Sequence, residues 1–339
     1  MSIKYEFDAR PDNGKTLNIA DGLEWLRMPL PFSLNHINLW LLRDGARWAI
    51  VDTGIGNSET RNLWRTVFDD GLGGDPVSHV IATHMHPDHV GCAGFLAHHF
   101  DVDLWMPRDE YMMCRILVAD TGRDTPEEGV RFYKDAGFTD TQLESYQKLF
   151  GLYGKSVTPL PEAYKRISDD DELTIGGHTW RVITGGGHSP EHACLYDRDR
   201  NILIAGDQLL PTISSNVSVW PTEPLANPLQ DWFDSLHKLR AAVPEDVLVL
   251  PAHGKPFRGA HPRIATMIRE HEERLEMLRS SCVEPQRAID VFPAIYRTKI
   301  DDGNRIMATG EAISHLHYLV AAGEVTTEYR DEATWYMTA

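Results

Sequence analysis

Short apolar runs separated by turn residues dominate the first part of the chain. Two such runs in "NHINLWLLRDGARWAIVDTG" (35–54) flank Asp44-Gly45, a favoured turn pair, and predict a β-hairpin. "SHVIATH" (78–84) predicts a strand buried on both faces, and a helix through "FLAHHF" and a strand at "VDLWMP" follow it. This mixture of strand pairs and helices favours an α/β sandwich over a βα barrel.

The pattern changes twice further along the chain. Residues 107–165 are rich in helix formers and aromatic side chains, and they predict helices inserted between strands. Strand patterns resume at "RISDDDELTIGGHTWRVITGGGHSP", with turns at Gly176-Gly177 and "DRDRN", and a Pro/Asn/Ser-rich loop spans 213–228. A helix over "LQDWFDSLHKLRAAV" and a strand at "VLVLPAHG" then complete a first domain, residues 1–262.

The last part of the chain predicts a second, small domain over residues 263–339. A charged helix is followed by helical patterns near 285–297 and 303–322 and by a hairpin in "GEVTTEYRDEATWYMT". The order helix, helix, helix, hairpin indicates a winged helix. Its third helix, "RIMATGEAISHLHYLVAAGE", is poor in basic residues, which disfavours DNA binding. Packing on the sandwich, or a homodimer interface, is the alternative role.

Composition narrows the class of partner. The chain has 339 residues and a formal net charge of -17, which disfavours nucleic acid and anionic membrane surfaces. The N-terminal residues lack the pattern of a signal peptide, and no apolar run approaches the ~18 residues of a membrane helix. Four dispersed cysteines without a CxxC pair indicate reduced thiols. We therefore expect a cytoplasmic protein.

Three histidines and an aspartate crowd the segment "ATHMHPDHVGC" (82–92), just after a buried strand. A strand end followed by a tight loop can aim His84, His86, Asp88 and His89 at one small volume. Imidazole and carboxylate together suit zinc, and also iron or manganese. A polar loop with incidental histidines is the alternative, and the density of the pattern disfavours it. The segment predicts a metal site.

Further ligands must come from elsewhere in the fold, and three candidates share the same setting. His188 in "TGGGHSPEH", Asp207 in "ILIAGDQL" and His253 in "VLVLPAHGKP" each follow a strand and precede a Gly or Pro turn. An aspartate that ends an apolar strand is costly unless it is paired or bound to metal. We interpret His36 and His192 as supporting residues rather than ligands, and the other histidines as surface or core residues.

The set "VDTG", "THMHPDH", "GGGHSPEH", "AGDQ" and "PAHG" resembles the metallo-β-lactamase superfamily over roughly residues 20–260. The resemblance implies an αββα sandwich with a pair of metal ions at one edge of the two sheets. It places His84, His86 and His188 on one ion and Asp88, His89 and His253 on the other. Asp207 would bridge both ions, and Asp52 of "VDTG" would orient a ligand histidine without touching metal.

Details of the motifs narrow the branch of the superfamily. Dizinc lactamases carry a cysteine where this chain has Asp207, so β-lactam hydrolysis is not expected. The bridging aspartate is similar to that of glyoxalase II, acyl-thioesterases, lactonases and nucleases. His86 stands where flavodiiron proteins carry a glutamate. The helical insert and the C-terminal tail resemble lactamase-like hydrolases with a winged helix, a branch that includes thioesterases and a ribonuclease.

The resemblance implies a hydrolase with two divalent ions, zinc first and manganese or iron as alternatives. A hydroxide shared by the ions would attack the carbonyl of a thioester or related ester, while Asp88 would orient it and relay its proton. The absence of a G-x-S-x-G motif fits this scheme, since no protein nucleophile is needed. Cys92 follows the histidine cluster closely, and we interpret it as a packed thiol.

Side chains of the insert and of the 213–228 loop are candidates for contact with a small-molecule acyl substrate. The candidates are Tyr111, Phe132, Tyr133, Tyr153 and Trp220. Packing of the insert's own helices is the alternative role. Four other functions stay open: a lactonase, an RNA endonuclease, a non-enzymatic binding protein, and a mononuclear iron dioxygenase of the persulfide type. In the dioxygenase, iron would use His84, His188 and Asp207.

Overall fold

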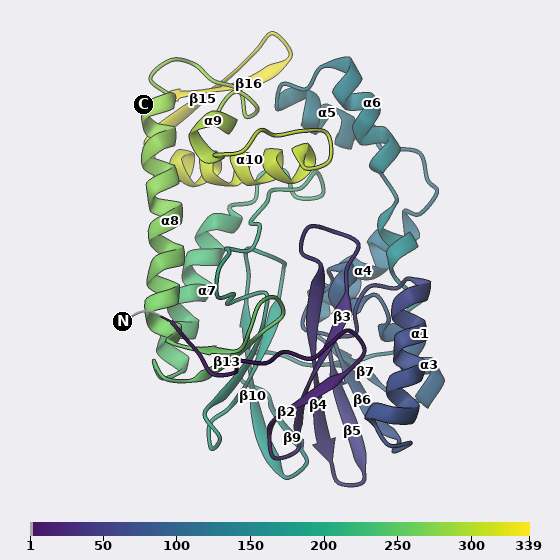
Figure 1. Cartoon of the computed structure of the whole chain (residues 1–339). Helices are drawn as coiled ribbons and strands as arrows, with labels where there is room; N and C mark the ends of the chain where they lie inside the picture. Colours follow the sequence, from purple (N-terminus) through teal and green to yellow (C-terminus); the bar gives the residue numbers. More distant parts are fainter. Residues whose placement is uncertain (1–2) are drawn as a thin grey trace.

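Two seven-stranded β-sheets packed face to face form the body of the molecule (Figure 1). The computed structural model describes residues 3–339. The first sheet has the order β2-β3-β4-β5-β6-β7-β8, with parallel pairing from β5 to β8. Its strands are β2 (Thr16–Ala20), β3 (Leu23–Pro29), β4 (His36–Asp44), β5 (Arg47–Val51), β6 (Val77–Ile81), β7 (Leu104–Met106) and β8 (Lys165–Arg166). The predicted hairpin is confirmed as β4 and β5.

The second sheet has the order β1-β14-β13-β12-β11-β10-β9, and only β12 and β13 pair in parallel within it. Its strands are β1 (Lys4–Tyr5), β9 (Glu172–Ile175), β10 (His178–Gly185), β11 (His192–Asp197), β12 (Ile202–Gly206), β13 (Leu248–Pro251) and β14 (Phe257–Arg258). Gly176 and Gly177 form the turn between β9 and β10, and both have positive φ angles, as that two-residue turn requires.

Helices cover the outer face of each sheet, so the predicted αββα sandwich is confirmed (Figure 1). The first sheet is covered by α1 (Ser58–Thr66), a π-helical turn η1 (Val67–Gly71), α2 (Pro87–Val90), α3 (Ala93–Phe100) and α4 (Arg108–Ala119). The second is covered by α7 (Pro228–Ala242) and α8 (Ala260–Ser281). Asn57 accepts a hydrogen bond from the backbone N–H of Thr60 and so caps the start of α1.

Burial on both faces explains the continuous apolar runs of the central strands. In β4, Trp40 and Leu42 face the core between the sheets, while Leu39 and Leu41 face the outer helices. A strand covered on both sides needs no polar positions. The core between the sheets ends at the strand termini, where the sequence turns polar.

The predicted helical insert is present as α5 (Glu127–Asp135), α6 (Asp140–Leu149) and a short 3-10 turn η2 (Tyr153–Ser156), following α4. Helix α5 lies against the C-terminal part of the chain (Figure 1): Lys134 pairs with Glu332 at 2.9 Å, and Ala136 O accepts a hydrogen bond from Ile289 N. The insert and the C-terminal elements therefore stand together above one end of the sandwich.

The C-terminal elements follow the predicted order with one correction. They are α8, α9 (Phe292–Ile295), α10 (Arg305–Ala321) and the hairpin β15 (Val325–Arg330) and β16 (Ala333–Thr338). The helix predicted over 285–297 is wrong for most of its length. Gln286 instead exchanges two backbone hydrogen bonds with Tyr336 of β16, and Pro293 lies in the first turn of the short α9, where it opposes a helix that continues from upstream. The winged-helix interpretation stays a prediction.

The expected domain boundary at 262 and 263 falls inside α8. The first turns of this helix, with Ile264 and Met267, pack in the apolar cluster that covers the second sheet. Its later turns pack beside α10 (Figure 1). A single helix thus joins the sandwich to the C-terminal elements, and the boundary stays a prediction. Among residues 3–339, no helix is long and apolar enough to cross a membrane.

Candidate metal centre

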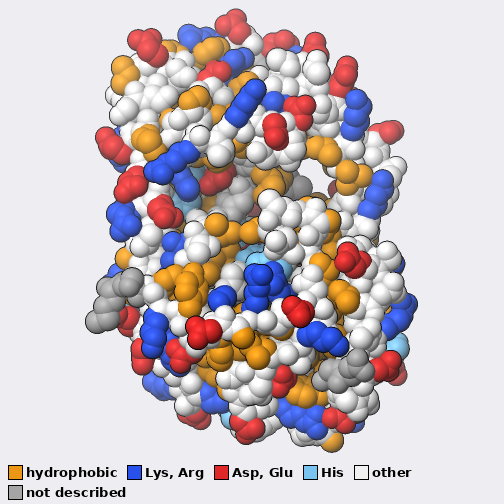
Figure 2. All heavy atoms as spheres, in the orientation of Figure 1, with side chains coloured by type: hydrophobic (Ala, Val, Ile, Leu, Met, Phe, Trp, Pro, Cys, Tyr) orange, Lys and Arg blue, Asp and Glu red, His pale blue; other side chains and the backbone are white. Residues whose placement is uncertain are grey.

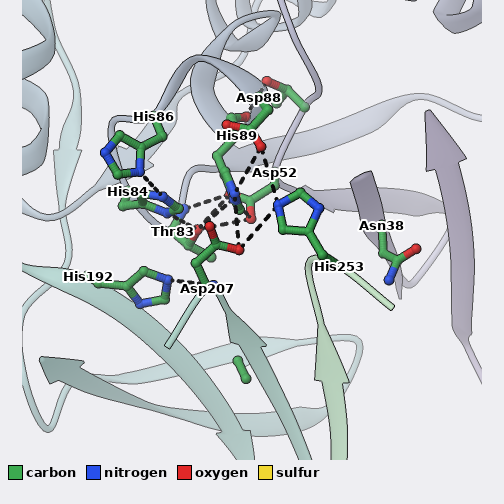
Figure 3. Close-up of polar contacts among 12 residues, drawn as sticks. Asn38, Asp52, Thr83, His84, His86, Asp88, His89, His192, Asp207 and His253 are labelled. Atoms are coloured by element: carbon green, nitrogen blue, oxygen red, sulfur yellow. Dashed lines mark hydrogen bonds and ion pairs between the residues drawn. The ribbon is translucent and has the colours of Figure 1, made fainter. Parts of the chain in front are cut away.

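The side chains of all seven predicted ligands meet at one end of the sandwich, and Figure 3 labels all of them except His188. Each follows the carboxyl end of a strand: β6 precedes the His84–His89 segment, β10 precedes His188, β12 precedes Asp207, and β13 precedes His253. Within each of two groups, the potential ligand atoms lie within 4.8 Å of one another. One group is His84, His86, His188 and Asp207; the other is Asp88, His89 and His253.

Asp207 lies between the two groups. Its Oδ2 is 3.3 Å from Nε2 of His188, in the first group. Its Oδ1 is 3.5 Å from Nε2 of His89 and 3.5 Å from Nε2 of His253, in the second. Asp88 closes the second group, with Oδ2 3.3 Å from Nε2 of His253. One carboxylate thus faces both sets of imidazoles, which is the placement that the resemblance implied for a bridging ligand.

Hydrogen bonds on the outer side of the rings set which nitrogen of each histidine carries the proton. Nδ1 of His188 lies 2.7 Å from the Asn216 carbonyl oxygen, and Nδ1 of His253 lies 2.8 Å from that of His36. Nδ1 of His89 lies 2.8 Å from Asp52 Oδ2. These oxygens can only accept, so Nδ1 donates in all three rings. In the neutral rings, each Nε2 therefore turns a lone pair toward the centre.

The first group shows why a cation suits this arrangement. Nδ1 of His86 lies 2.9 Å from Nε2 of His84 and 3.0 Å from Nε2 of His188. Burial, and the neighbouring His188, lower the pKa of His86 to about 3, so the ring is neutral at physiological pH. Lone pairs this close repel one another unless a proton or a metal ion lies among them.

The second group carries an excess of negative charge. Burial alone would lower the pKa of His89, but Asp52, Asp207 and Asp88 outweigh it and hold that pKa well above its usual value. Among the described residues, buried His89 Nε2 and Asp207 Oδ1 have no hydrogen-bond partner. A divalent cation would supply the positive charge that the carboxylates favour and would satisfy both atoms. The residues present therefore fit a metal centre.

Asp52 is placed as the sequence predicted, behind a ligand rather than among the ligands (Figure 3). It accepts hydrogen bonds from the backbone N–H and the hydroxyl of Thr83. The Thr83 hydroxyl, having donated its proton to Asp52, accepts from Nδ1 of His84 at 3.0 Å. Asp52 itself has φ of 59°, in the left-handed region. One buried carboxylate thus orients both His84 and His89.

Glu110 of α4 supports two of the ligand loops and was missed by the sequence analysis. Its Oε2 accepts from Met85 N at 2.9 Å, and its Oε1 accepts from the Ser189 hydroxyl at 2.6 Å and from Glu191 N at 2.7 Å. Burial raises the pKa of Glu110 to about 7 although these three hydrogen bonds oppose the rise. Its sequence context, "PRDEYMM", looks like an ordinary charged helix start and gives no signal.

Asn38, His36 and His192 support the other ligands. Asn38 donates to the carbonyl oxygens of Pro251 and Gly254, on either side of His253. His36 Nε2 accepts from Gly254 N at 3.1 Å. His192 Nε2 accepts from Asp207 N at 3.1 Å and lies beside Asp207 (Figure 3). The interpretation of His36 and His192 as supporting residues agrees with these contacts.

The 213–228 loop connects the centre to α10. Asn216, whose carbonyl fixes His188, also donates from its side chain to Glu311 of α10 at 3.3 Å. Val219 N donates to Gly310 O, and the Ser218 hydroxyl donates to Met307 O. The orientation of His188, a candidate ligand, therefore depends on a helix of the C-terminal part of the chain.

The five candidate substrate residues are in different environments. Tyr111 and Tyr133 are buried, with Tyr111 donating to the Pro161 carbonyl and Tyr133 packed in the insert, so both are poorly placed to touch a substrate. Phe132 is half-buried against the C-terminal core. Tyr153 donates to the Met85 carbonyl and so braces a ligand loop. Trp220 is 36% exposed and is the most accessible of the five.

Cys92 is a packed thiol. It is fully buried, its Sγ donates to the Ile55 carbonyl at 3.3 Å, and burial raises its pKa to about 12. A thiol with this pKa carries almost no thiolate at neutral pH. The interpretation of Cys92 as a packed thiol is confirmed by its burial.

The family model of the metallo-beta-lactamase superfamily matches residues 33–254, and that of the metallo-beta-lactamase-like C-terminal domain matches residues 275–339. The chain belongs to the metallo-beta-lactamase superfamily. It is similar to a beta-lactamase domain protein from Burkholderia ambifaria of known crystal structure, with 42% sequence identity and a TM-score of 0.91. That match covers 99% of this chain and 98% of the other.

Two named relatives are more distant. The human acyl-coenzyme A thioesterase MBLAC2 is 25% identical over 56% of this chain and 64% of its own length. The atrochrysone carboxyl ACP thioesterase of Aspergillus fumigatus is 26% identical over 76% of this chain and 47% of its own length. The chain spans just under two thirds of the first curated relatives that it matches.

Proposed function

We propose that the protein is a dinuclear metal-dependent hydrolase of a thioester or a related ester of a small acyl group. The observation that carries this proposal is the convergence of seven ligand side chains on the two faces of one buried aspartate. Six of the seven form two sets of three, and Asp207 stands between the sets. Zinc suits the imidazole and carboxylate donors, with manganese or iron as alternatives.

The named relatives support a thioester substrate. One is a thioesterase of acyl-coenzyme A and the other of an acyl carrier protein. Both names describe the same bond, an acyl carbonyl joined to sulfur. Asp207, in place of a cysteine ligand, accords with this branch rather than with β-lactam hydrolysis.

The side chains of this chain would divide the work as follows. His84, His86 and His188 would hold one ion, His89, His253 and Asp88 the other, and Asp207 both. When bound, the ions would activate water and polarise the carbonyl. The Asp88 side chain is 20% exposed, twice as much as the 10% of Asp207, so it is the more accessible of the two carboxylates to water. It is therefore placed to orient the attacking water and take its proton.

Three other enzymatic functions remain to be separated from this one by experiment. A lactonase would use the same centre on a cyclic ester. An RNA endonuclease would need a basic surface, which the net charge of -17 disfavours. A mononuclear iron dioxygenase would leave Asp88, His89 and His253 without a metal, although the three converge closely.

Metal content and thioester turnover test the proposal together. Protein purified without added metal should contain about two zinc or manganese ions per chain by elemental analysis. It should hydrolyse acyl-coenzyme A or acyl-N-acetylcysteamine faster than homoserine lactones or single-stranded RNA. One iron per chain, with oxygen consumption on a glutathione persulfide, would replace this proposal by the dioxygenase.

Ligand variants provide the second arm of this test. His86→Ala and Asp207→Ala should lower kcat by at least about a thousandfold, because each removes a ligand of the activating ions. His98→Ala, an exposed histidine of α3, is the matched control and should retain activity. Wild-type rates in folded, metal-verified His86→Ala or Asp207→Ala protein would exclude the metal-hydrolase function.

A further inference from the structure

The core between the two sheets changes from apolar to polar at the end that holds the metal centre. On β3, Trp25 faces this core, and Arg27 is the next residue on the same face. On β4, Asn38 is the residue opposite Arg27 in the antiparallel register, and its side chain reaches the loop that carries His253. An arginine thus stands at the edge of the core, beside a supporting residue of the centre.

Arg27 is buried without a partner. The side chain is only 8% exposed, and its Nε is a buried donor without an acceptor. Within the part of the chain that the structure describes, its guanidinium forms no hydrogen bond and no ion pair within 4 Å. The neighbouring Asn38 Oδ1 is buried and unpartnered as well. A buried charge is costly unless an opposite charge or hydrogen-bond acceptor joins it. An anion would supply the partner that the Arg27 guanidinium lacks.

The surroundings of Arg27 place that anion next to the metal centre. His36, which binds Gly254, lies with its ring 6.1 Å from the ring of His253. The positive charges of Arg27 and Arg10 both act on the His36 ring. Arg10 is an exposed residue of the N-terminal segment.

The net charge around Arg27 is positive. Arg10 and Arg27 each bring one positive charge, and Asp12 brings a negative charge that acts on Arg27. Asp12 is exposed and forms no ion pair with Arg27 among the described contacts. Figure 2 shows Lys or Arg side chains gathered beside a histidine at the middle of this face of the molecule. The charge near Arg27 is thus positive although the whole chain has a net charge of -17, and a positive site favours the binding of an anion.

We propose that Arg27 and Arg10 bind an anionic group of the substrate, a carboxylate or a phosphate, and hold it beside His36 while the carbonyl lies at the metal centre. The proposal rests on the proposed function and gives it a substrate class: acyl compounds that carry a negative charge away from the reacting bond. Guanidinium groups bind carboxylate and phosphate oxygens in pairs, and a buried guanidinium binds them most strongly.

A panel of four thioesters separates the two sources of the anion. Butyryl and succinyl groups differ by a terminal carboxylate on the acyl chain, and N-acetylcysteamine and coenzyme A differ by the phosphates of the carrier. Wild-type protein should show a kcat/KM at least about tenfold higher for whichever member carries the recognised anion, the size of one charged hydrogen bond. Equal kcat/KM for all four compounds would overturn the proposal.

Two variants assign the preference to these arginines. Arg27→Met keeps the length of the side chain without its charge, and Arg10→Ala changes an exposed residue. Each should lower kcat/KM for the preferred anionic thioester by about tenfold or more and change the neutral one by less than about threefold. Arg47→Ala, an exposed arginine at the turn between β4 and β5, is the matched control and should change neither.

Stability and binding measurements keep the test independent of turnover. A buried charge without a partner destabilises the fold, so Arg27→Met should retain or raise the melting temperature. A structural role for Arg27 would instead lower it. Isothermal titration of glutarate and of inorganic phosphate into the metal-loaded protein should show weaker binding in Arg27→Met than in Arg47→Ala for at least one of the two anions. Equal binding of both anions by these variants would overturn the proposal even if no thioester is hydrolysed.

Discussion

At the residue scale, the orientation of the candidate ligands depends on side-chain and backbone groups that bind Nδ1 of a histidine, on the side of the ring away from the centre. Asp52, the Thr83 hydroxyl and the carbonyl oxygens of His36 and Asn216 each accept a hydrogen bond from the Nδ1 of a histidine, so that the Nε2 of that histidine faces the centre. Asp52 was predicted because it sits in a motif. The two carbonyls were not, since any residue type offers a carbonyl and only the fold decides where it points. The candidate ligands can be predicted from the sequence, whereas most of the groups that orient them cannot.

A Glu110 variant tests whether the groups behind the candidate ligands contribute to metal binding. Glu110→Ala would leave Met85 N, Glu191 N and the Ser189 hydroxyl without their shared acceptor, so both ligand loops should loosen. We expect zinc affinity to fall by about 10- to 100-fold, measured by competition with a chromophoric chelator. Glu162→Ala, whose side chain is 89% exposed, should match wild type. Unchanged affinity in Glu110→Ala would show that the loops hold their shape without it.

At the element scale, the ends of the strands are the parts that the sequence predicts best. Strands β6, β12 and β13 each appear as an apolar run that stops at a polar motif, and β10 as a partly alternating run that does so, because the core stops there too. The helix predicted at 285–297 failed for a long-range reason. Its residues follow a helical pattern, but the hydrogen bonds of Gln286 go to Tyr336, fifty residues later in the chain. No local pattern contains that pairing.

Two buried histidines join α8 to α10 and make a pH prediction possible. His271 Nδ1 lies 3.0 Å from His315 Nε2, and His315 Nδ1 donates to the Glu311 carbonyl at 2.8 Å. Burial is the largest cause that lowers the pKa of both rings below the usual 6.5. As the pH falls, these histidines therefore take up protons in the unfolded chain before they do so in the folded chain. The free energy of unfolding that is present above about pH 6.5 decreases below that pH.

Thermal unfolding between pH 7.5 and 5 tests this pair. Wild-type stability should fall below pH 6.5 by up to about 1.4 kcal/mol per pH unit for each histidine. The double variant His271→Gln/His315→Gln should fall less steeply, while His98→Gln on α3 should follow wild type. Parallel curves for all three proteins would show that the pair does not contribute to the acid sensitivity.

At the scale of the whole molecule, the helical insert and the C-terminal elements, which the sequence predicts as separate parts, contact each other, and the C-terminal elements also contact the sandwich. The insert pairs with the C-terminal hairpin through Lys134 and Glu332, and α10 holds the loop that fixes His188 (Figure 1). The sequence predicts these elements separately because each has its own pattern. Their contacts connect residues about a hundred or more positions apart, such as Asn216 and Glu311, and only the folded chain reveals them.

Gly310 tests the link between α10 and the centre. A Cβ at this position would lie 2.7 Å from Ser218 Cβ and 2.8 Å from the Val219 carbonyl oxygen. Gly310→Val should therefore push the loop and α10 apart, cost about 1–3 kcal/mol in urea unfolding, and lower kcat although no ligand is changed. Ala321→Val, at an exposed position of the same helix, should do neither. A Gly310→Val protein with normal stability and kcat would show that the contact is dispensable.

The close contact at Gly310 also limits how such chains can recombine in evolution. A C-terminal half taken from another gene would arrive with its own residue opposite Ser218, and any side chain there would displace the loop behind His188. The sandwich and the C-terminal part must therefore be inherited together, or the residues on both sides of this contact must change together. Chimeras joined within α8 should work only when the donor brings a glycine to this position.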